Sequence, residues 1–114
     1  MAALDRFTQL SAPRQALVRL FQSVNFGQLL DIAIQDGDPL FYPEPTVLFD
    51  VKLDADEGQR QEADLSDFAL RDEVRRLMAR LDQLKNGRIE RIEVRSGIPR
   101  RVVIESRLTE APFL

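Results

Sequence analysis

The chain has 114 residues, of which 44% are hydrophobic and 31% are charged, and its formal net charge at pH 7 is −3. This length fits one domain, and this composition is typical of a soluble globular protein rather than a disordered one. No apolar run approaches the roughly 18 to 20 residues that cross a bilayer, and the N-terminus lacks the pattern of a secretion signal. We therefore expect a single cytoplasmic domain over residues 1–114, without a membrane partner.

The chain contains neither cysteine nor histidine. The lack of cysteine excludes disulfides and thiolate metal sites. The lack of histidine removes the usual general base, the usual metal ligand and the usual partner of a catalytic serine. The two lysines, Lys52 and Lys85, lie outside any phosphate-binding loop motif. We expect no enzyme activity, no catalytic residue, no cofactor and no metal, and an enzyme that uses carboxylates alone is the least favoured class.

The first predicted element is a helix that begins near Ser11. Serine suits the N-cap position, and Pro13 is tolerated in the first turn. Apolar residues then recur at helical spacing, at Leu17, Leu20, Phe21 and Val24. Gly27 stands where this helix must end, close to the position of a C-cap glycine.

An alternating strand follows Gly27, with Leu30, Ile32 and Ile34 on one face. The letters QDGDP then indicate a turn. After the proline-rich stretch PLFYPEP we expect a second strand over residues 47–53. The first unit, residues 11–54 approximately, is thus a helix followed by two strands.

The same order recurs after an acidic linker at about residues 55–65. Ser66 is a candidate N-cap for the second helix. Apolar residues at helical spacing follow it, at Val74, Leu77, Met78, Leu81 and Leu84. The second unit covers about residues 66–108, and a short tail over residues 109–114 follows.

The two units also resemble each other in sequence. GQLLDIAIQDGDP (residues 27–39) and GRIERIEVRSGIP (residues 87–99) are identical at four of thirteen positions, at an offset of 60 residues. The second strands, residues 47–53 and 102–108, match at an offset of 55, which predicts five extra residues in the first hairpin connection. A tandem duplication explains both matches.

One unit alone could not bury its apolar face, since an isolated hairpin is marginal in water. Two units can share a sheet that both helices cover from the same side. We predict an α+β fold, a pseudo-twofold duplicated αββ-αββ unit with a four-stranded antiparallel sheet and two helices on one face. The strand order stays open because either hairpin edge could meet at the centre, and the edge strands left exposed could pair between chains.

Each copy consists of a helix, the pattern FGxLxxIxIxDGxP and a charged strand, and it resembles the small bacterial YezD-type proteins, which consist of about one αββ unit. The resemblance covers LVRLFQSVNFGQLLDIAIQDG (residues 17–37) best and the second copy more loosely. It implies the fold unit and an unassigned function, and it implies no catalytic residues. The chain departs from this family in carrying two units and a proline-rich insertion.

The two units carry opposite charge. Residues 31–57 contain eight acidic residues and one basic residue, a net charge of −7, whereas residues 85–107 contain seven basic and three acidic residues, a net charge of +4. The acidic half of one molecule could therefore meet the basic half of another, which would give head-to-tail contacts. The alternative is that both charged surfaces are simply solvated.

Four arginines of the second unit are expected to point outward from the open sheet face: Arg91, Arg95, Arg101 and Arg107. Arginine suits phosphate, so binding to a nucleic acid is the alternative function. Strand aromatics that would stack on bases are missing, and the chain is acidic overall. Glu93 and Glu105, placed between these arginines, favour cross-strand ion pairs instead.

The stretch from Pro39 to Pro45 places Phe41 and Tyr42 between prolines. A stiff loop lowers the ordering cost of binding, and exposed aromatics are good interface anchors. The alternative is that both rings fold back over the end of the sheet. Phe113 and Leu114 in the tail leave the same choice open.

The sequence therefore predicts a non-catalytic protein-interaction or assembly module. We expect it to self-associate or to dock on a larger complex, through the open sheet face, the edge strands and the proline-rich loop. The predicted contact residues are Phe41, Tyr42, Arg91, Arg95, Arg101 and Arg107.

Overall fold

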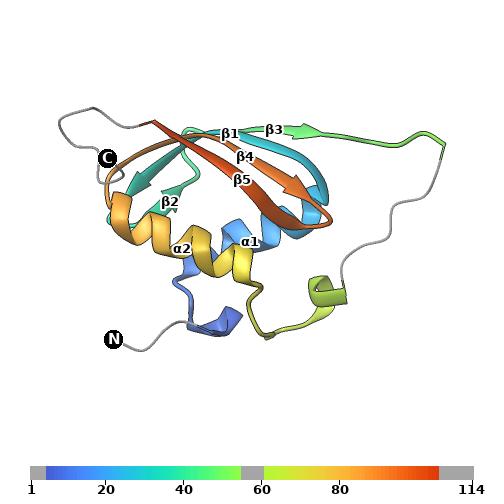
Figure 1. Cartoon of the computed structure of the whole chain (residues 1–114), viewed down its shortest axis with the longest axis horizontal. Coiled ribbons are helices and arrows are strands. Elements are labelled where there is room, and N and C mark those ends of the chain that lie inside the picture. The colour runs from blue at the N-terminus through green and yellow to red at the C-terminus, as the bar shows by residue number, and fades with distance from the viewer. Residues whose placement is uncertain (1–4, 55–60, 106–114) are drawn as a thin grey trace.

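The chain folds into two layers, an antiparallel sheet above two α-helices (Figure 1). The computed structural model describes residues 5–54 and 61–105. The elements in chain order are η1 (Phe7–Gln9), α1 (Ala12–Val24), β1 (Phe26–Gln35), β2 (Asp38–Leu40), β3 (Thr46–Phe49), η2 (Gln61–Asp64), α2 (Asp72–Leu84), β4 (Gly87–Arg95) and β5 (Ile98–Glu105), where η marks a 3₁₀ helix. None of the helices in this described part of the chain is long and apolar enough to cross a membrane.

The sheet has the order β2-β1-β4-β5. β3 also pairs with β1, along residues 27–30, whereas β2 pairs with residues 33–35 of the same strand. All pairs are antiparallel, and β1 and β4 meet at the centre. Both helices lie on one face of the sheet (Figure 1). The predicted α+β class with an antiparallel sheet is confirmed, but the predicted number of strands is wrong, because the described residues form five strands and not four.

The fifth strand arises because the proline-rich insertion divides one strand into two. Pro43 and Pro45 lie between β2 and β3, and proline has no N–H to donate to a sheet ladder. The strand expected over residues 47–53 ends at Phe49.

The register also revises the size of the insertion. Val47 lies opposite Leu29 in the first unit, and Ile104 lies opposite Ile89 in the second. Leu29 and Ile89 are 60 residues apart, whereas Val47 and Ile104 are 57 apart, so the pairing implies three extra residues rather than five.

The alternation of β1 is interrupted at Asp31, which has a φ of 60°. Leu29 and Ile32 are both fully buried, whereas Leu30 is only partly buried, so the predicted inward position of Leu30 is wrong. A bulge-like residue of this kind shifts the side-chain alternation by one position. In β4, Ile89 and Ile92 are fully buried with the same spacing.

The start of α1 follows the prediction, and the start of α2 does not. The Ser11 hydroxyl accepts a hydrogen bond of 3.4 Å from the Arg14 N–H, as expected of an N-cap. The N-cap of α2 is Arg71 rather than Ser66. Residues 66–70 instead pair with the N-terminal segment, where the Phe7 N–H donates to the Phe68 carbonyl at 2.9 Å.

This N-terminal pairing adds Phe7 and Phe68 to the hydrophobic core. The rings of Phe7 and Phe68 stack with centroids 4.8 Å apart, and the Arg19 guanidinium lies 4.4 Å from the Phe7 centroid. The carboxylate of Asp67 accepts hydrogen bonds from the Arg6 guanidinium at 2.7 Å and from the Thr8 N–H at 3.1 Å. These hydrogen bonds, of which the one from Arg6 contributes most, lower the pKa of Asp67 to about 2.

The main core lies between the sheet and the helices. Both units supply residues with essentially no exposed surface: Leu17, Phe21, Leu29, Ile32, Leu81, Ile89 and Ile92. The turns that follow β1 and β4 also agree in conformation. Asp36 and Gly37 have φ values of 52° and 79°, and Ser96 and Gly97 have values of 56° and 72°. Two successive positive φ values are typical of tight hairpin turns.

Candidate functional site

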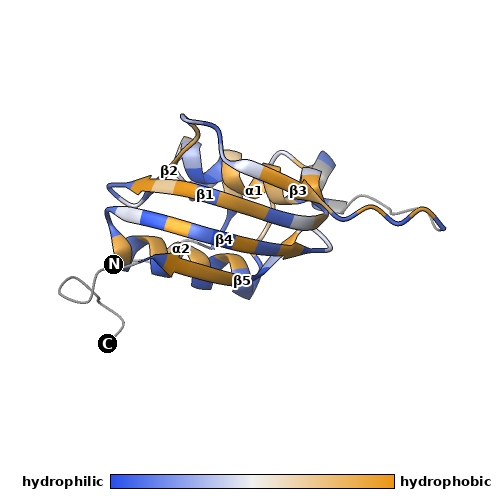
Figure 2. Cartoon of the chain, turned by 90° about the horizontal axis from the view of Figure 1, so that it is seen from above, coloured by the Kyte–Doolittle hydropathy of each residue, from blue (hydrophilic) through white to orange (hydrophobic). Residues whose placement is uncertain are grey.

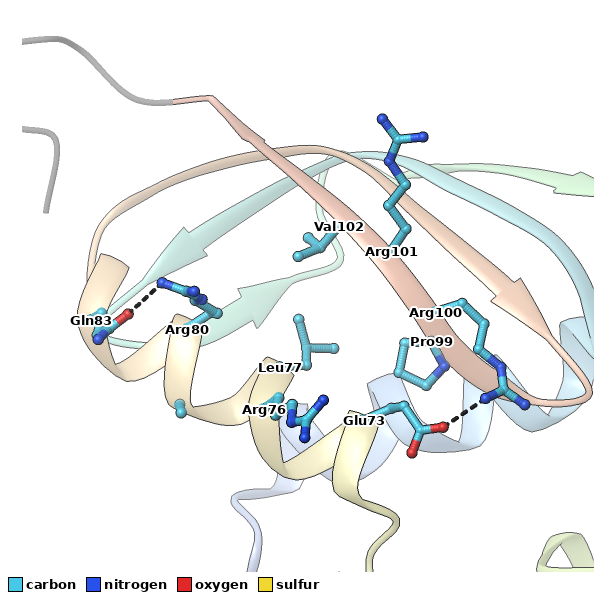
Figure 3. Close-up of a pocket in the computed structure, with 10 residues that line it drawn as sticks. Glu73, Arg76, Leu77, Arg80, Gln83, Pro99, Arg100, Arg101 and Val102 are labelled. Atoms are coloured by element: carbon cyan, nitrogen blue, oxygen red, sulfur yellow. Dashed lines mark hydrogen bonds and ion pairs between the residues drawn. The ribbon is translucent and has the colours of Figure 1, made fainter. Parts of the chain in front are cut away.

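A groove of about 440 Å³ lies between α2 and the edge strand β5 (Figure 3). We call it the α2–β5 groove. Residues of α2 form one wall and the first half of β5 forms the other. The lining residues are Glu73, Arg76, Leu77, Ala79, Arg80, Gln83, Pro99, Arg100, Arg101 and Val102.

The walls of this groove are basic. Four arginines line it against one carboxylate, that of Glu73. Arg100 forms an ion pair with Glu73 at 2.6 Å, and Arg80 donates to the Gln83 side chain at 3.2 Å. Arg76 and Arg101 form no ion pair within the described residues. The excess of positive charge favours an acidic partner.

Two neighbouring arginines of β5 point to opposite sides of the sheet. Figure 3 shows Arg100 directed toward α2 and Arg101 directed away from it. The register explains the position of Arg100, because Glu93 pairs with Arg101 and Val94 with Pro99, which leaves Arg100 as an extra residue. The bulge therefore lets β5 present cations both toward the helix and toward the open face.

The floor of the groove is apolar and lies beside an unpaired strand edge. Leu77 of α2 is buried, and Val102 of β5 packs against the core. Within the described residues β5 pairs with β4 alone, so its outer edge has no neighbouring strand. An edge strand beside an apolar groove is the arrangement that binds an extended segment by strand addition.

A second unusual surface lies on the opposite edge of the sheet. Residues 46–53, which we call the β3 arm, begin as β3 and continue away from the body (Figure 1). Four large apolar side chains of this arm are exposed, with relative exposures of 46% for Leu48, 61% for Phe49, 65% for Val51 and 95% for Leu53. Figure 2 shows apolar and polar residues alternating along the extension.

The two aromatic residues of the proline-rich loop have different surroundings. Phe41 is partly buried and packs against the core. Tyr42 is 84% exposed. Phe41 therefore adopts the folded-back position that the sequence left as an alternative, while Tyr42 is accessible to a partner. Phe113 and Leu114 lie outside the described residues.

The predicted arginines of the open face are only partly brought together. Arg95 and Arg101 are exposed and Arg91 is partly buried, while Arg107 lies outside the described residues. Glu93 lies opposite Arg101 in the sheet. Among the residues described, however, neither Glu93 nor Glu105 forms an ion pair, so the expected cross-strand ion pairs are absent.

Sequence reasoning missed most of the groove and the arm. Arg76 and Arg80 lie one helical turn apart on either side of Leu77, a signal that predicts a shared face of α2. The position of Arg100 depends on a bulge that no sequence pattern marked. The exposure of Phe49 and Val51 depends on the early end of β3.

No metal-binding chemistry is evident in the described ranges, which contain no group of three or more acidic, histidine or cysteine side chains arranged to hold an ion. The comparisons add no relative: the chain matches no protein-family model, no curated protein and no solved structure.

Proposed function

We propose that this protein is a non-catalytic interaction module that binds another polypeptide through the edges of its sheet. The observation that carries the proposal is the row of exposed apolar side chains on the β3 arm. Burying a Val, Leu or Phe side chain gains about 1.5–3 kcal/mol. Exposed apolar side chains gathered on one segment are typical of an interaction site.

The charge distribution supports association between copies. The acidic first unit supplies the edge formed by β2 and β3, and the basic second unit supplies the edge formed by β5. Oppositely charged edges attract, and they suppress pairing of an edge with itself. Self-association is therefore the form of interaction that we favour over docking on a foreign complex.

We also propose that the two halves arose by duplication of one αββ unit, of the kind seen in the YezD-type proteins that the sequence resembles. Three buried positions in β1, Leu29, Ile32 and Ile34, correspond to Ile89, Ile92 and Val94 in β4 at the offset of 60. The two hairpin turns share their positive φ values. These agreements support the proposal, and the unequal second strands record where the copies have diverged.

The test compares two variants of exposed apolar residues. The arm variant replaces Val51 and Leu53 with serine. The matched control replaces Leu65, which lies away from the arm and is 46% exposed, with serine as well. Light scattering of the purified protein and size exclusion of cell extract each report association. We expect a multimer or a larger complex that the arm variant reduces and the control does not. A single-chain mass in both measurements would contradict the proposed function.

A second candidate function, binding to a nucleic-acid backbone, is favoured by one observation, the grouping of four arginines around the α2–β5 groove. Changing Arg76 and Arg101 to glutamate would then abolish binding to a random single-stranded oligonucleotide. Serine at Val51 and Leu53 would leave that binding unchanged. If the variants change protein association and leave oligonucleotide binding unaffected, the result supports the interaction module.

A further inference from the structure

We propose that the α2–β5 groove binds the β3 arm of a second copy of this chain, which adds to β5 as an extra strand. This inference rests on the proposed function, and it names the partner and the two surfaces that meet. Each molecule would contribute its arm to one neighbour and its groove to another.

The first argument is the face of the sheet to which the side chains of the arm point. Val47 packs against the core, so it points to the helix side of the sheet. Side chains in a strand alternate between faces, which places Phe49 on that same side, and Val51 and Leu53 would follow it once the arm continues as a strand beside β5. Beyond the Asp50 N–H, which donates to the Phe26 carbonyl at 2.8 Å, the arm extends past the start of β1 (Figure 1). Val51 and Leu53 therefore have no sheet of their own molecule to cover.

The groove offers a matching surface on the helix side of β5. A strand added beside β5 directs every second side chain under the sheet. There it would meet Leu77 and Val102, the apolar floor, and Pro99 at one end (Figure 3). Phe49, Val51 and Leu53 of the neighbour would fill this space, and they would exchange exposed surface for apolar contact.

The groove carries an excess of positive charge, and the arm contributes one acidic residue, Asp50, beside one basic residue, Lys52. Asp50 and Lys52 alternate with the apolar residues and would point to the open face, where Arg101 is exposed. Asp54 follows the arm in the sequence. Arg76, at the outer wall of the groove, has no acidic partner within the described part of the chain. Arg101 would gain the carboxylate of Asp50 at this interface.

The lengths also agree, since four residues of β5, 99–102, line the groove and the arm continues for four residues, 50–53, beyond β3. The contact joins two different surfaces, so it is heterologous and repeats from molecule to molecule. Repeated contacts form a closed ring if the rotation between neighbouring molecules returns to the first one, and an open filament if it does not.

The test uses two variants that each remove one surface. The arm variant carries Val51→Asp and Leu53→Asp, and the groove variant carries Arg76→Glu and Arg101→Glu. All four positions are exposed, and circular dichroism with thermal unfolding checks that each variant retains its fold. We expect wild-type multimers that grow with concentration, and association about 100-fold weaker or more for either variant alone. Mixing the two variants should restore one intact contact and give a complex of two chains that grows no further.

Three outcomes would overturn the inference. If the wild type associates and neither variant weakens it, copies meet elsewhere and the proposed function survives without this partner site. If the mixed variants remain single chains although each was weakened, arm and groove do not bind each other. If the purified wild type is a single chain at every concentration, a second copy is not the occupant, while a larger complex in cell extract would still uphold the interaction module.

Discussion

The guanidinium of Arg14 and the carboxylate of Asp82 meet at 2.6 Å, although the two residues are 68 positions apart. Arg14 also donates to the Gly37 carbonyl from two nitrogens, at 3.0 and 2.9 Å. Its side chain is 9% exposed, whereas that of Asp82 is 67% exposed. Arg14 therefore joins α1, the first hairpin turn and α2, and the carbonyl of Gly37 is the partner that lies in the interior.

We predict that Arg14→Met destabilises the fold by about 2–3 kcal/mol, because the substitution leaves the buried Gly37 carbonyl without its donors. Asp82→Asn, the matched control, should cost less than about 1 kcal/mol, because ion pairs with exposed partners contribute little. Urea denaturation measures both. Equal losses for the two variants would show that the exposed ion pair, and not the buried carbonyl, is what matters.

The two repeat glycines should differ in their tolerance of alanine. A Cβ added at Gly27 would lie 1.9 Å from the Leu48 carbonyl oxygen, which belongs to the paired strand β3. A Cβ at Gly87 would meet only the Leu84 side chain, at 2.8 Å. Backbone cannot move aside as a side chain can. We expect Gly27→Ala to cost about 2–3 kcal/mol and Gly87→Ala about 1 kcal/mol or less, measured by thermal unfolding. Similar values would contradict the close approach of β3.

Acid should weaken the contact between the N-terminal segment and the start of α2. The pKa of Asp67 is about 2, below its ordinary value of 3.8. A lowered native pKa means that the carboxylate stabilises the fold above about pH 4, and that this contribution is lost as the pH falls from about 4 toward 2. Asp67→Asn should remove this part of the pH dependence. Melting temperatures that fall in parallel for wild type and variant over this range would contradict it.

The two loop aromatics, Phe41 and Tyr42, should differ in how much they contribute to the stability of the fold. Phe41 packs against the core and Tyr42 is 84% exposed. Phe41→Ala should therefore destabilise the fold by about 1–3 kcal/mol, since the ring is partly buried. Tyr42→Ala should leave the unfolding midpoint within about 0.5 kcal/mol of wild type. Chemical denaturation of both variants distinguishes the roles, and a large loss for Tyr42→Ala would place its ring inside rather than outside.

Much of the fold is predictable because its signals are local. The apolar spacing of Leu17 and Phe21, the cap at Ser11 and the turn at Gly37 each depend on a few adjacent residues. The shift in β1 is not predictable in this way, because Asp31 adopts a positive φ, which is uncommon for any residue other than glycine although aspartate tolerates it. Ser66 fails as a cap because its segment pairs with the N-terminus, a contact that no local pattern encodes.

The candidate site depends almost entirely on such long-range information. Arg76 and Arg101 come from different elements and line one groove only because β5 lies at the sheet edge next to α2. The apolar residues within 47–53 predict a strand, and part of this segment forms β3. Their exposure arises because β3 ends at Phe49, opposite the start of its partner strand β1.

The most direct test of self-association is the solution mass of the purified protein by light scattering after size exclusion, over a range of concentrations at low and at high salt. We predict a mass above that of one chain at low salt. It should fall as salt rises, because screening weakens the attraction between the acidic and basic edges. A mass of one chain at every concentration and every salt would contradict self-association.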